Sequence, residues 1–152
     1  MKVTAQPSEF VRLNMEIKIK LVDPAAKAPV KLRDSDACFD LYAVSGHFGP
    51  DYTEYDTGVA FEIPDGYCGL VFARSSISNK GMYLSNGVGV IDAPYRGTVR
   101  VRFYRNTADY YQPGERVAQI MFVPVLPVTL VPSDELAPSS RGTGGFGSTG
   151  QK

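Results

Sequence analysis

A glycine-rich segment near the C-terminus combines residue types that suit the binding of a phosphorylated ligand. Residues 141–150 read RGTGGFGSTG. The glycines allow backbone N–H groups to approach a phosphate, and Ser148 and Thr149 add hydroxyl donors. Arg141 matches the oxygens of a terminal phosphate, and Phe146 offers a ring on which a base can stack. The segment therefore predicts a lid that closes over a nucleotide, although by composition alone a flexible tail is the commoner interpretation.

Asp92 stands in a stretch, residues 86–97, whose two apolar parts flank a turn and predict a β-hairpin. An aspartate before Ala-Pro is most often a turn residue that bonds its own backbone. A carboxylate at a hairpin tip can also orient and deprotonate a water, and the backbone beside it can recognise the edge of a base. Tyr95 fits either a core position or a stacking surface.

Asp40 lies between Phe39 and Leu41, so a strand here places its carboxylate on the face opposite the apolar one. Such an aspartate is either solvated or an outer-sphere ligand of Mg²⁺, which keeps its waters and binds one or two carboxylates. Both interpretations remain open from the sequence.

Arg74, Ser75 and Ser76 follow an apolar strand and open a segment, residues 75–80, that is long enough for a turn or two of helix. Hydroxyl and N–H groups at such a start favour an anion, but an N-cap beside a surface arginine is an equally good interpretation. Gln119 lies in an apolar strand and needs a partner there, either main chain or phosphate.

The elements that must position these residues are predicted to be β-strands. Apolar and polar residues alternate in residues 17–21, 59–63 and 99–103, and residues 117–125 form the apolar run of a strand buried on both faces. Gly, Pro and Asp turn signals separate the strands at short intervals. The chain is therefore predicted to be all-β, as a sandwich, jelly roll or barrel.

The totals exclude several classes of protein. The formal net charge of the 152 residues is zero, without the basic field of a nucleic-acid binder, and no apolar run approaches the ~20 residues of a membrane helix. One histidine, His47, argues against a Ser-His-Asp or Cys-His nucleophile and against a histidine-rich zinc site. Cys38 and Cys68 form no C-x-x-C and are expected to be reduced thiols.

One domain is predicted over residues 1–152. Residues 1–14 are mixed and polar, without a signal-peptide core, and are interpreted either as a native extension or as a non-native addition before a plausible natural start at Met15. Residues 139–152 are predicted to be a mobile C-terminal arm. These features favour a cytoplasmic protein, or a protein of the host cytoplasm if the source is a virus.

Together and in this order, five segments resemble the five motifs of trimeric dUTP pyrophosphatases, the dUTPases. They are residues 37–41 (ACFDL), 74–76 (RSS), 89–97 (GVIDAPYRG), 114–119 (GERVAQ) and 141–150 (RGTGGFGSTG). The resemblance runs from about residue 16 to residue 150, and its last motif is the most specific. It implies a jelly-roll-like fold of the β-clip kind and a homotrimer that exchanges C-terminal arms, with active sites between subunits.

The resemblance also implies an activity: hydrolysis of dUTP to dUMP and pyrophosphate with Mg²⁺, which keeps uracil out of DNA and supplies dUMP for dTMP synthesis. The implied partners are dUTP and the other subunits, with no nucleic acid and no membrane. Asp92 would activate the water that attacks the α-phosphorus. Asp40 would hold, through water, a Mg²⁺ that the phosphates bind directly, and Tyr95 would pack under the deoxyribose and exclude a 2′-hydroxyl.

The remaining site residues that the resemblance implies fall into three groups. Those that bind the phosphate chain are Arg74, Ser75, Ser76 and Gln119, those that recognise uracil are Asn86, Gly89, Val90 and Ile91, and those of the closing arm are Arg141, Phe146, Gly147, Ser148 and Thr149.

Some positions depart from the family pattern. Cys38 and Ser76 stand where the family usually has Gly, Ala73 where it has Pro, and Pro94 where it commonly has Asp. None of these changes removes a residue assigned to chemistry, so they bear on rate and affinity rather than on the presence of activity.

Two related interpretations compete with dUTP hydrolysis. The dCTP deaminases share the fold and a similar Arg-Ser-Ser motif but look to a glutamate near the hairpin, and this chain has none between Glu62 and Glu115. A non-catalytic nucleotide-binding regulatory trimer on the same fold is the second, and the presence of both Asp40 and Asp92 argues against it.

Overall fold

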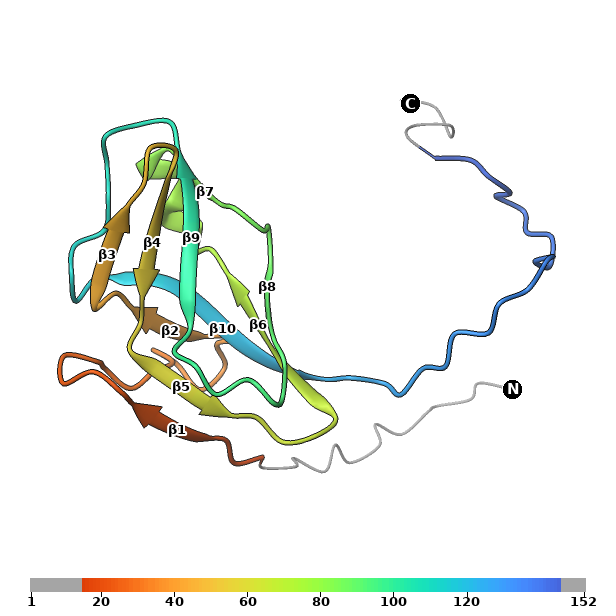
Figure 1. The fold of residues 1–152 in the computed structure, drawn as a ribbon, viewed down its shortest axis with the longest axis horizontal. Coiled ribbons are helices and arrows are strands. Elements are labelled where there is room, and N and C mark those ends of the chain that lie inside the picture. The colour runs from red at the N-terminus through yellow and green to blue at the C-terminus, as the bar shows by residue number, and fades with distance from the viewer. Residues whose placement is uncertain (1–14, 146–152) are drawn as a thin grey trace, which may run out of the picture.

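A computed structural model describes residues 15–145 of the chain, and these residues confirm the prediction of an all-β protein (Figure 1). The elements in chain order are β1 (Lys18–Leu21), β2 (Phe39–Tyr42), β3 (Ser45–Phe48), β4 (Tyr52–Asp56), β5 (Val59–Glu62), β6 (Tyr67–Phe72), the 3₁₀ helix η1 (Ser75–Lys80), β7 (Met82–Leu84), β8 (Gly89–Ile91), β9 (Arg100–Arg105) and β10 (Arg116–Pro124). The short helix predicted at residues 75–80 is present. No helix within residues 15–145 is long and apolar enough to cross a membrane.

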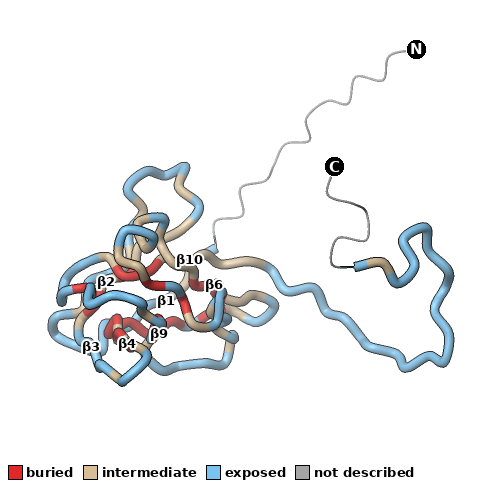
Figure 2. Tube along the Cα trace, turned by 90° about the horizontal axis from the view of Figure 1, so that it is seen from above, coloured by how far each residue is buried: buried red, intermediate tan, exposed pale blue. Residues whose placement is uncertain are grey.

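The strands form two antiparallel four-stranded sheets, ordered β2-β10-β6-β8 and β3-β4-β9-β7, and a two-stranded sheet of β1 and β5. Side chains from both larger sheets meet in one core, which includes Leu41 and Ile120 from the first sheet and Tyr55 and Phe103 from the second. Figure 2 shows the buried residues gathered between the layers, with exposed chain around them. The arrangement is a jelly-roll-like sandwich.

The alternation predicted in residues 99–103 is present in β9. Val101 and Phe103 are buried, whereas Arg100 and Arg102 are exposed on the other face. Burial of each apolar side chain contributes about 1.5–3 kcal/mol to folding. On the exposed face Arg102 donates a hydrogen bond of 2.7 Å to Glu54 on β4.

β10 is the central strand that joins β2 to β6, and it contains a bulge. Its register against β2 shifts between Arg116 and Ala118, so that both Val117 and Ala118 are buried. In a regular strand Arg116 and Gln119, three positions apart, would point to opposite faces. The extra residue brings both side chains to the face of Asp40, which pairs with Gln119.

The predicted β-hairpin in residues 86–97 is wrong. β8 pairs with β6 (Gly69 with Ile91), and β7 pairs with β9, so the chain crosses from one sheet to the other between β7 and β8. It crosses back before β9. Alternation gives the face of each strand but not its partner, because partners are chosen by long-range packing.

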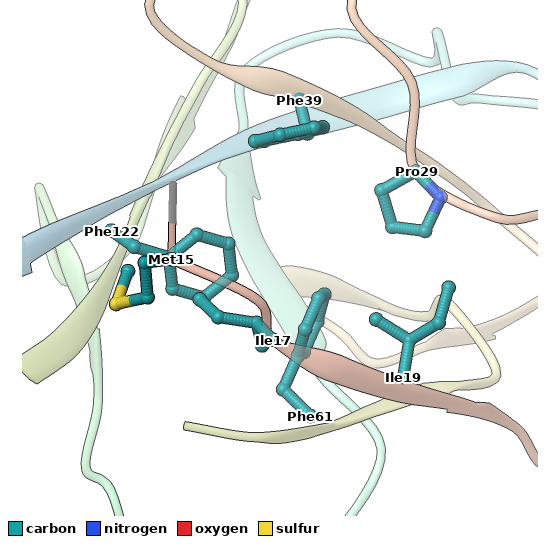
Figure 3. Close-up of a pocket in the computed structure, with 7 residues that line it drawn as sticks. All are labelled: Met15, Ile17, Ile19, Pro29, Phe39, Phe61 and Phe122. Carbon is teal, nitrogen blue, oxygen red and sulfur yellow. The ribbon is translucent and has the colours of Figure 1, made fainter. Parts of the chain in front are cut away.

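β1 leaves part of its apolar side uncovered. Ile19 is 42% exposed and Leu21 is 46% exposed. Beside β1 lies an apolar groove of about 300 Å³, drawn in Figure 3, whose rings include Phe39, Phe61 and Phe122. The Phe61 and Phe122 ring centroids are 5.4 Å apart. An apolar groove of this kind on a small domain suits a protein contact.

After β10 the chain leaves the body as an extended arm (Figure 1). Its last main-chain bond to the body is the one that the Val125 N–H donates to the Gly66 carbonyl, at 2.7 Å. Leu130 and Leu136 on the arm are each 89% exposed. The arm and the groove are therefore two apolar surfaces that this single chain leaves in water.

Candidate active site

Three of the four predicted phosphate-binding residues, Arg74, Ser75 and Gln119, meet at one cavity between β2, β10 and the start of η1, whereas Ser76 does not line it. The cavity has a volume of about 420 Å³. The residues that line it are Leu32, Asp36, Ala37, Cys38, Asp40, Arg74, Ser75 and Gln119. Three of the sequence motifs, 37–41, 74–76 and 114–119, thus converge on one place in the fold.

Asp40 is the anchor of this cavity, and the solvated alternative for it is wrong. Its side chain is 13% exposed and is bound by two arginines. Arg74 Nε donates to Asp40 Oδ1 at 2.8 Å, and Arg116 Nη1 donates to Asp40 Oδ2 at 3.0 Å. The two guanidinium groups offset the charge of the Asp40 carboxylate, while the second carboxylate of the lining, Asp36, accepts a hydrogen bond from the Arg33 N–H. Guanidinium groups fixed in this way suit an anionic ligand.

Arg116 is the ion-pair partner of Asp40 that sequence reasoning missed, because no role was assigned to it within residues 114–119. The bulge in β10 is the reason, since it moves Arg116 to a face that regular alternation denies it. The sequence carried one usable signal, an arginine directly after Gly114-Glu115, in a turn that enters a buried strand.

The half-buried side chain of Gln119 has a main-chain hydrogen-bond partner, one of the two partners expected from the sequence. Its Nε2 donates to the Ala73 carbonyl at 3.0 Å. This bond ties β10 to the residue before Arg74 and leaves the amide oxygen and a second N–H for a ligand. Arg74 likewise uses Nε for Asp40, so its two terminal nitrogens are available for a phosphate.

The cysteines are free, as predicted, and half-buried. Cys38 lies in the wall of the cavity, where burial raises the pKa of its thiol and the nearby Lys31 opposes the rise. The thiol therefore stays protonated at neutral pH and packs as a small apolar group.

A second cavity, of about 330 Å³, lies along β8. The residues that line it are Val71, Leu84, Ser85, Asn86, Gly89, Val90, Ile91, Arg100, Val101 and Arg102. All four residues predicted to recognise a base are in this list. β8 is the edge strand of its sheet in residues 15–145, so one side of its backbone carries no strand partner there and offers donors and acceptors.

Asp92 follows β8 directly and is exposed. Its carbonyl accepts a hydrogen bond of 3.0 Å from the Tyr95 N–H, which closes a turn. Tyr95 is 45% exposed, so it is not a core residue. Its hydroxyl donates to the Thr98 carbonyl at 3.0 Å, and its ring covers Gly97, where a Cβ would clash with the phenol. The turn therefore presents Asp92 and a fixed aromatic ring together.

The two cavities lie at opposite edges of one sheet. β2 and β8 are three strand spacings apart in the order β2-β10-β6-β8, which corresponds to about 14 Å. Along the strands, Asp40 is level with Gln119, whereas Ile91 is level with Phe122 through Gly69, a further offset of about 10 Å. Within one chain, the structure does not bring Asp92 together with Asp40.

Arg141 belongs to the arm after β10, which Figure 1 shows extending away from the sheets, and it lines neither cavity. Its Nε donates to the Gly144 carbonyl at 2.9 Å, and the Gly142 N–H donates to the Ser139 carbonyl at 3.2 Å, so this part of the arm forms a local turn. The other arm residues assigned from the sequence, Phe146, Gly147, Ser148 and Thr149, lie outside the described residues.

A jelly-roll-like domain with a cavity lined by arginine and aspartate at one sheet edge and an open strand at the other has the architecture of a ligand-binding domain. Comparison with protein families then gives the specific assignment. A family model described as dUTPase matches residues 24–150. The chain belongs to the dUTPase family.

Relatives of known name and structure agree with this assignment. A deoxyuridine 5′-triphosphate nucleotidohydrolase of Hydrogenobaculum sp. is 39% identical over 140 residues, covering 80% of this chain and 96% of the relative. A dUTPase mutant of Staphylococcus bacteriophage 80alpha, solved with dUpNHpp, is 26% identical with a TM-score of 0.78, covering 89% and 98%. A mutant dUTPase of S. aureus phage phi11, described as coordinating a structural Mg(II) ion, is 23% identical with a TM-score of 0.68, covering 80% and 98%.

Proposed function

We propose that this chain hydrolyses dUTP to dUMP and pyrophosphate. The observation that carries the proposal is the cavity around Asp40 and Arg74, which three motifs of a dUTPase-family chain build from separate segments. Neither alternative gains support from the site, since no glutamate lies along β8, Asp40 lines a cavity and Asp92 is exposed directly after β8.

The cavity around Asp40 binds the phosphate chain. Asp40 holds Arg74 through Nε at the wall of the cavity and leaves its two terminal nitrogens for the ligand, while Ser75 and Gln119 add neutral donors. Hydrolysis gathers negative charge on the phosphate oxygens, so donors fixed before the reaction stabilise the transition state. The Asp40 carboxylate repels the phosphate oxygens little, because two arginines neutralise its charge.

β8 and the turn after it bind the nucleoside and supply the base. The open backbone edge at Gly89, Val90 and Ile91 pairs with uracil, whose donors and acceptors are reversed relative to cytosine where the two bases differ. Tyr95 packs under the deoxyribose, and Asp92 orients the attacking water and accepts its proton. An aspartate is a weak base at neutral pH, so its placement against the water supplies most of its effect.

Mg²⁺ fits this site as a companion of the substrate. No group of three His, Cys, Asp or Glu side chains that could hold a metal occurs within residues 15–145, and Asp40 already accepts bonds from two arginines. A carboxylate has about four acceptor positions, so Asp40 retains two for water molecules of a hydrated ion. The ion supplies charge neutralisation of the triphosphate when it is bound.

We infer that each complete site is assembled from different subunits of a homotrimer. Asp40 and Asp92 of one chain are separated by about 17 Å of sheet, too far to act on one phosphate chain. The apolar arm and the apolar groove beside β1 support the same inference, because a groove on one subunit can bury the arm of another. Residues 141–150 of that arm then close the site, with Arg141, Ser148 and Thr149 on the outer phosphates and Phe146 on uracil.

Pyrophosphate release from dUTP, dCTP, dTTP and UTP, each with Mg²⁺ and with a chelator, tests the proposal. We expect release from dUTP alone, and only with Mg²⁺. This single pattern requires base recognition, exclusion of the 2′-hydroxyl and the metal together. Release of ammonia from dCTP would establish the deaminase instead, and binding of dUTP without products would establish a regulatory trimer.

Mixing two inactive variants tests the sharing of sites. A chain with Asp92→Asn keeps the arm, and a chain truncated after Ser140 keeps Asp92. If one subunit supplies the turn that carries Asp92 and a different subunit supplies the arm of the same site, random exchange of equal amounts of the two variant subunits restores about a quarter of the active sites of the wild type. Native mass spectrometry, reading mixed trimers in the same sample, supplies the control. Mixed trimers without activity would show that one chain supplies both Asp92 and the arm.

A further inference from the structure

Tyr111 is a buried tyrosine whose hydroxyl has no hydrogen-bond partner among the described residues. The residue is 4% exposed, and its oxygen makes no hydrogen bond within residues 15–145. A buried hydroxyl without a partner costs free energy that phenylalanine at this position would avoid. Such a group calls for an explanation outside the packing of the core.

The ring of Tyr111 is held rigidly. It packs at 83° against Tyr55, with centroids 5.6 Å apart, and lies 6.0 Å from Phe103. The Tyr111 N–H donates to the Tyr55 hydroxyl at 2.8 Å. The ammonium of Lys80, the last residue of η1, stands 4.7 Å from the ring centroid. These contacts hold the Tyr111 ring, and with it the hydroxyl, in one position next to η1.

The Tyr111 ring packs against η1 through Lys80, and Arg74 and Ser76 at the start of this helix are near enough to influence the hydroxyl. Burial raises the pKa of Tyr111, while the Arg74 guanidinium and the Ser76 hydroxyl oppose the rise more weakly. The Ser76 side chain thus lies near the phenol oxygen but short of normal hydrogen-bond geometry, since that oxygen is unpartnered. Ser76 is half-buried, whereas Ser75 beside it is exposed at the cavity.

We propose that Tyr111 is a positioning residue for the phosphate-binding segment: its buried hydroxyl bonds Ser76 when phosphate enters the cavity, and this bond holds Arg74 and Ser75 toward the ligand. The proposal rests on the proposed function for its substrate. It also gives a role to Ser76, which is half-buried and does not line the cavity. Tyr111 acts through Ser76 and touches no substrate.

Tyr111→Phe removes the hydroxyl and leaves the ring with its contacts to Tyr55 and Lys80. We expect KM for dUTP to rise about fivefold, the effect of one lost neutral hydrogen bond, while kcat changes less than about twofold. The unfolding temperature should stay the same or rise, because an unpaired buried group is removed. Ser76→Ala should raise KM equally, and the double variant should raise it no further. Tyr110→Phe, at the exposed neighbouring tyrosine, is the matched control.

Hydrogen–deuterium exchange separates this proposal from the proposed function. Inorganic triphosphate with Mg²⁺ should protect residues 74–81 in the wild-type chain and in Tyr110→Phe, and this protection should be lost in Tyr111→Phe. The readout needs no hydrolysis of dUTP, so an enzyme inactive on dUTP can still confirm it. Equal KM and equal protection in the two tyrosine variants would overturn the proposal. A fall in unfolding temperature without any change of protection would reduce Tyr111 to a core residue.

Discussion

Asp92→Asn should lower kcat for dUTP by about a thousandfold and leave nucleotide affinity within a few-fold of the wild type. Asparagine keeps the size of the side chain and can still orient a water, but it cannot accept the proton of that water. Asp92 is exposed and its contact to Tyr95 uses the main-chain carbonyl, so the turn should remain intact. Stopped-flow turnover and calorimetric titration with a non-hydrolysable imido analogue of dUTP measure the two quantities separately.

Asp65→Asn is the control for this experiment, because Asp65 is also an exposed turn aspartate but lies between β5 and β6, away from both cavities. It should turn over dUTP like the wild type. Turnover by Asp92→Asn within tenfold of the wild type would remove Asp92 as the base. Loss of both turnover and binding would assign Asp92 to substrate binding instead.

Truncation after Ser140 should leave a folded trimer whose kcat/KM for dUTP is at least about a hundredfold lower. The apolar part of the arm, with Leu130 and Leu136, remains, so the contacts between subunits should persist. The truncation removes the Arg141 guanidinium group and the glycine-rich residues that would surround the outer phosphates. A closing segment also excludes water and fixes the reacting geometry, so its removal affects kcat as well as KM.

A chain that ends after Gly150 is the matched control, because it lacks only Gln151 and Lys152 and keeps the whole motif. It should retain full activity. Sedimentation of both truncated chains reports the oligomeric state independently of activity. A trimer that is fully active without residues 141–150 would exclude the lid, and a truncated chain that dissociates would give these residues an assembly role.

Local patterns predicted where strands lie better than how they are buried. The run 117–125, predicted to be a strand buried on both faces, ends at Pro124 and is only half-buried in its second part, with Val125 exposed. The apolar side predicted for residues 17–21 is exposed in β1.

The alternation in β9 placed Val101 and Phe103 in the core and Arg100 outside, and the all-β class followed from such stretches. These features depend on the two-residue period of a strand, which sequence records directly. The assignment of Asp40 to the face opposite Leu41 succeeded for the same reason.

Long-range choices could not be predicted in the same way. Nothing near Val90 in the sequence says that β8 pairs with β6 rather than with β7, because that pairing depends on which sheet buries Ile91. Arg116 bonds Asp40, which lies 76 positions earlier in the sequence, and this bond depends on the bulge in β10 between Arg116 and Ala118. The roles of the individual site residues remain predictions until the variants above are measured.

The position of β10 in its sheet has a consequence for folding during synthesis. β10 lies between β2 and β6, yet it is the last of the strands to be synthesised. Until it emerges, β2 and β6 have no shared neighbour, and their edges and apolar faces stay open to other nascent chains. Folding must therefore wait for nearly the whole chain and then close contacts distant in sequence, which is slow and exposed to aggregation. A chaperone that holds the nascent chain until β10 inserts would meet a need that this topology creates.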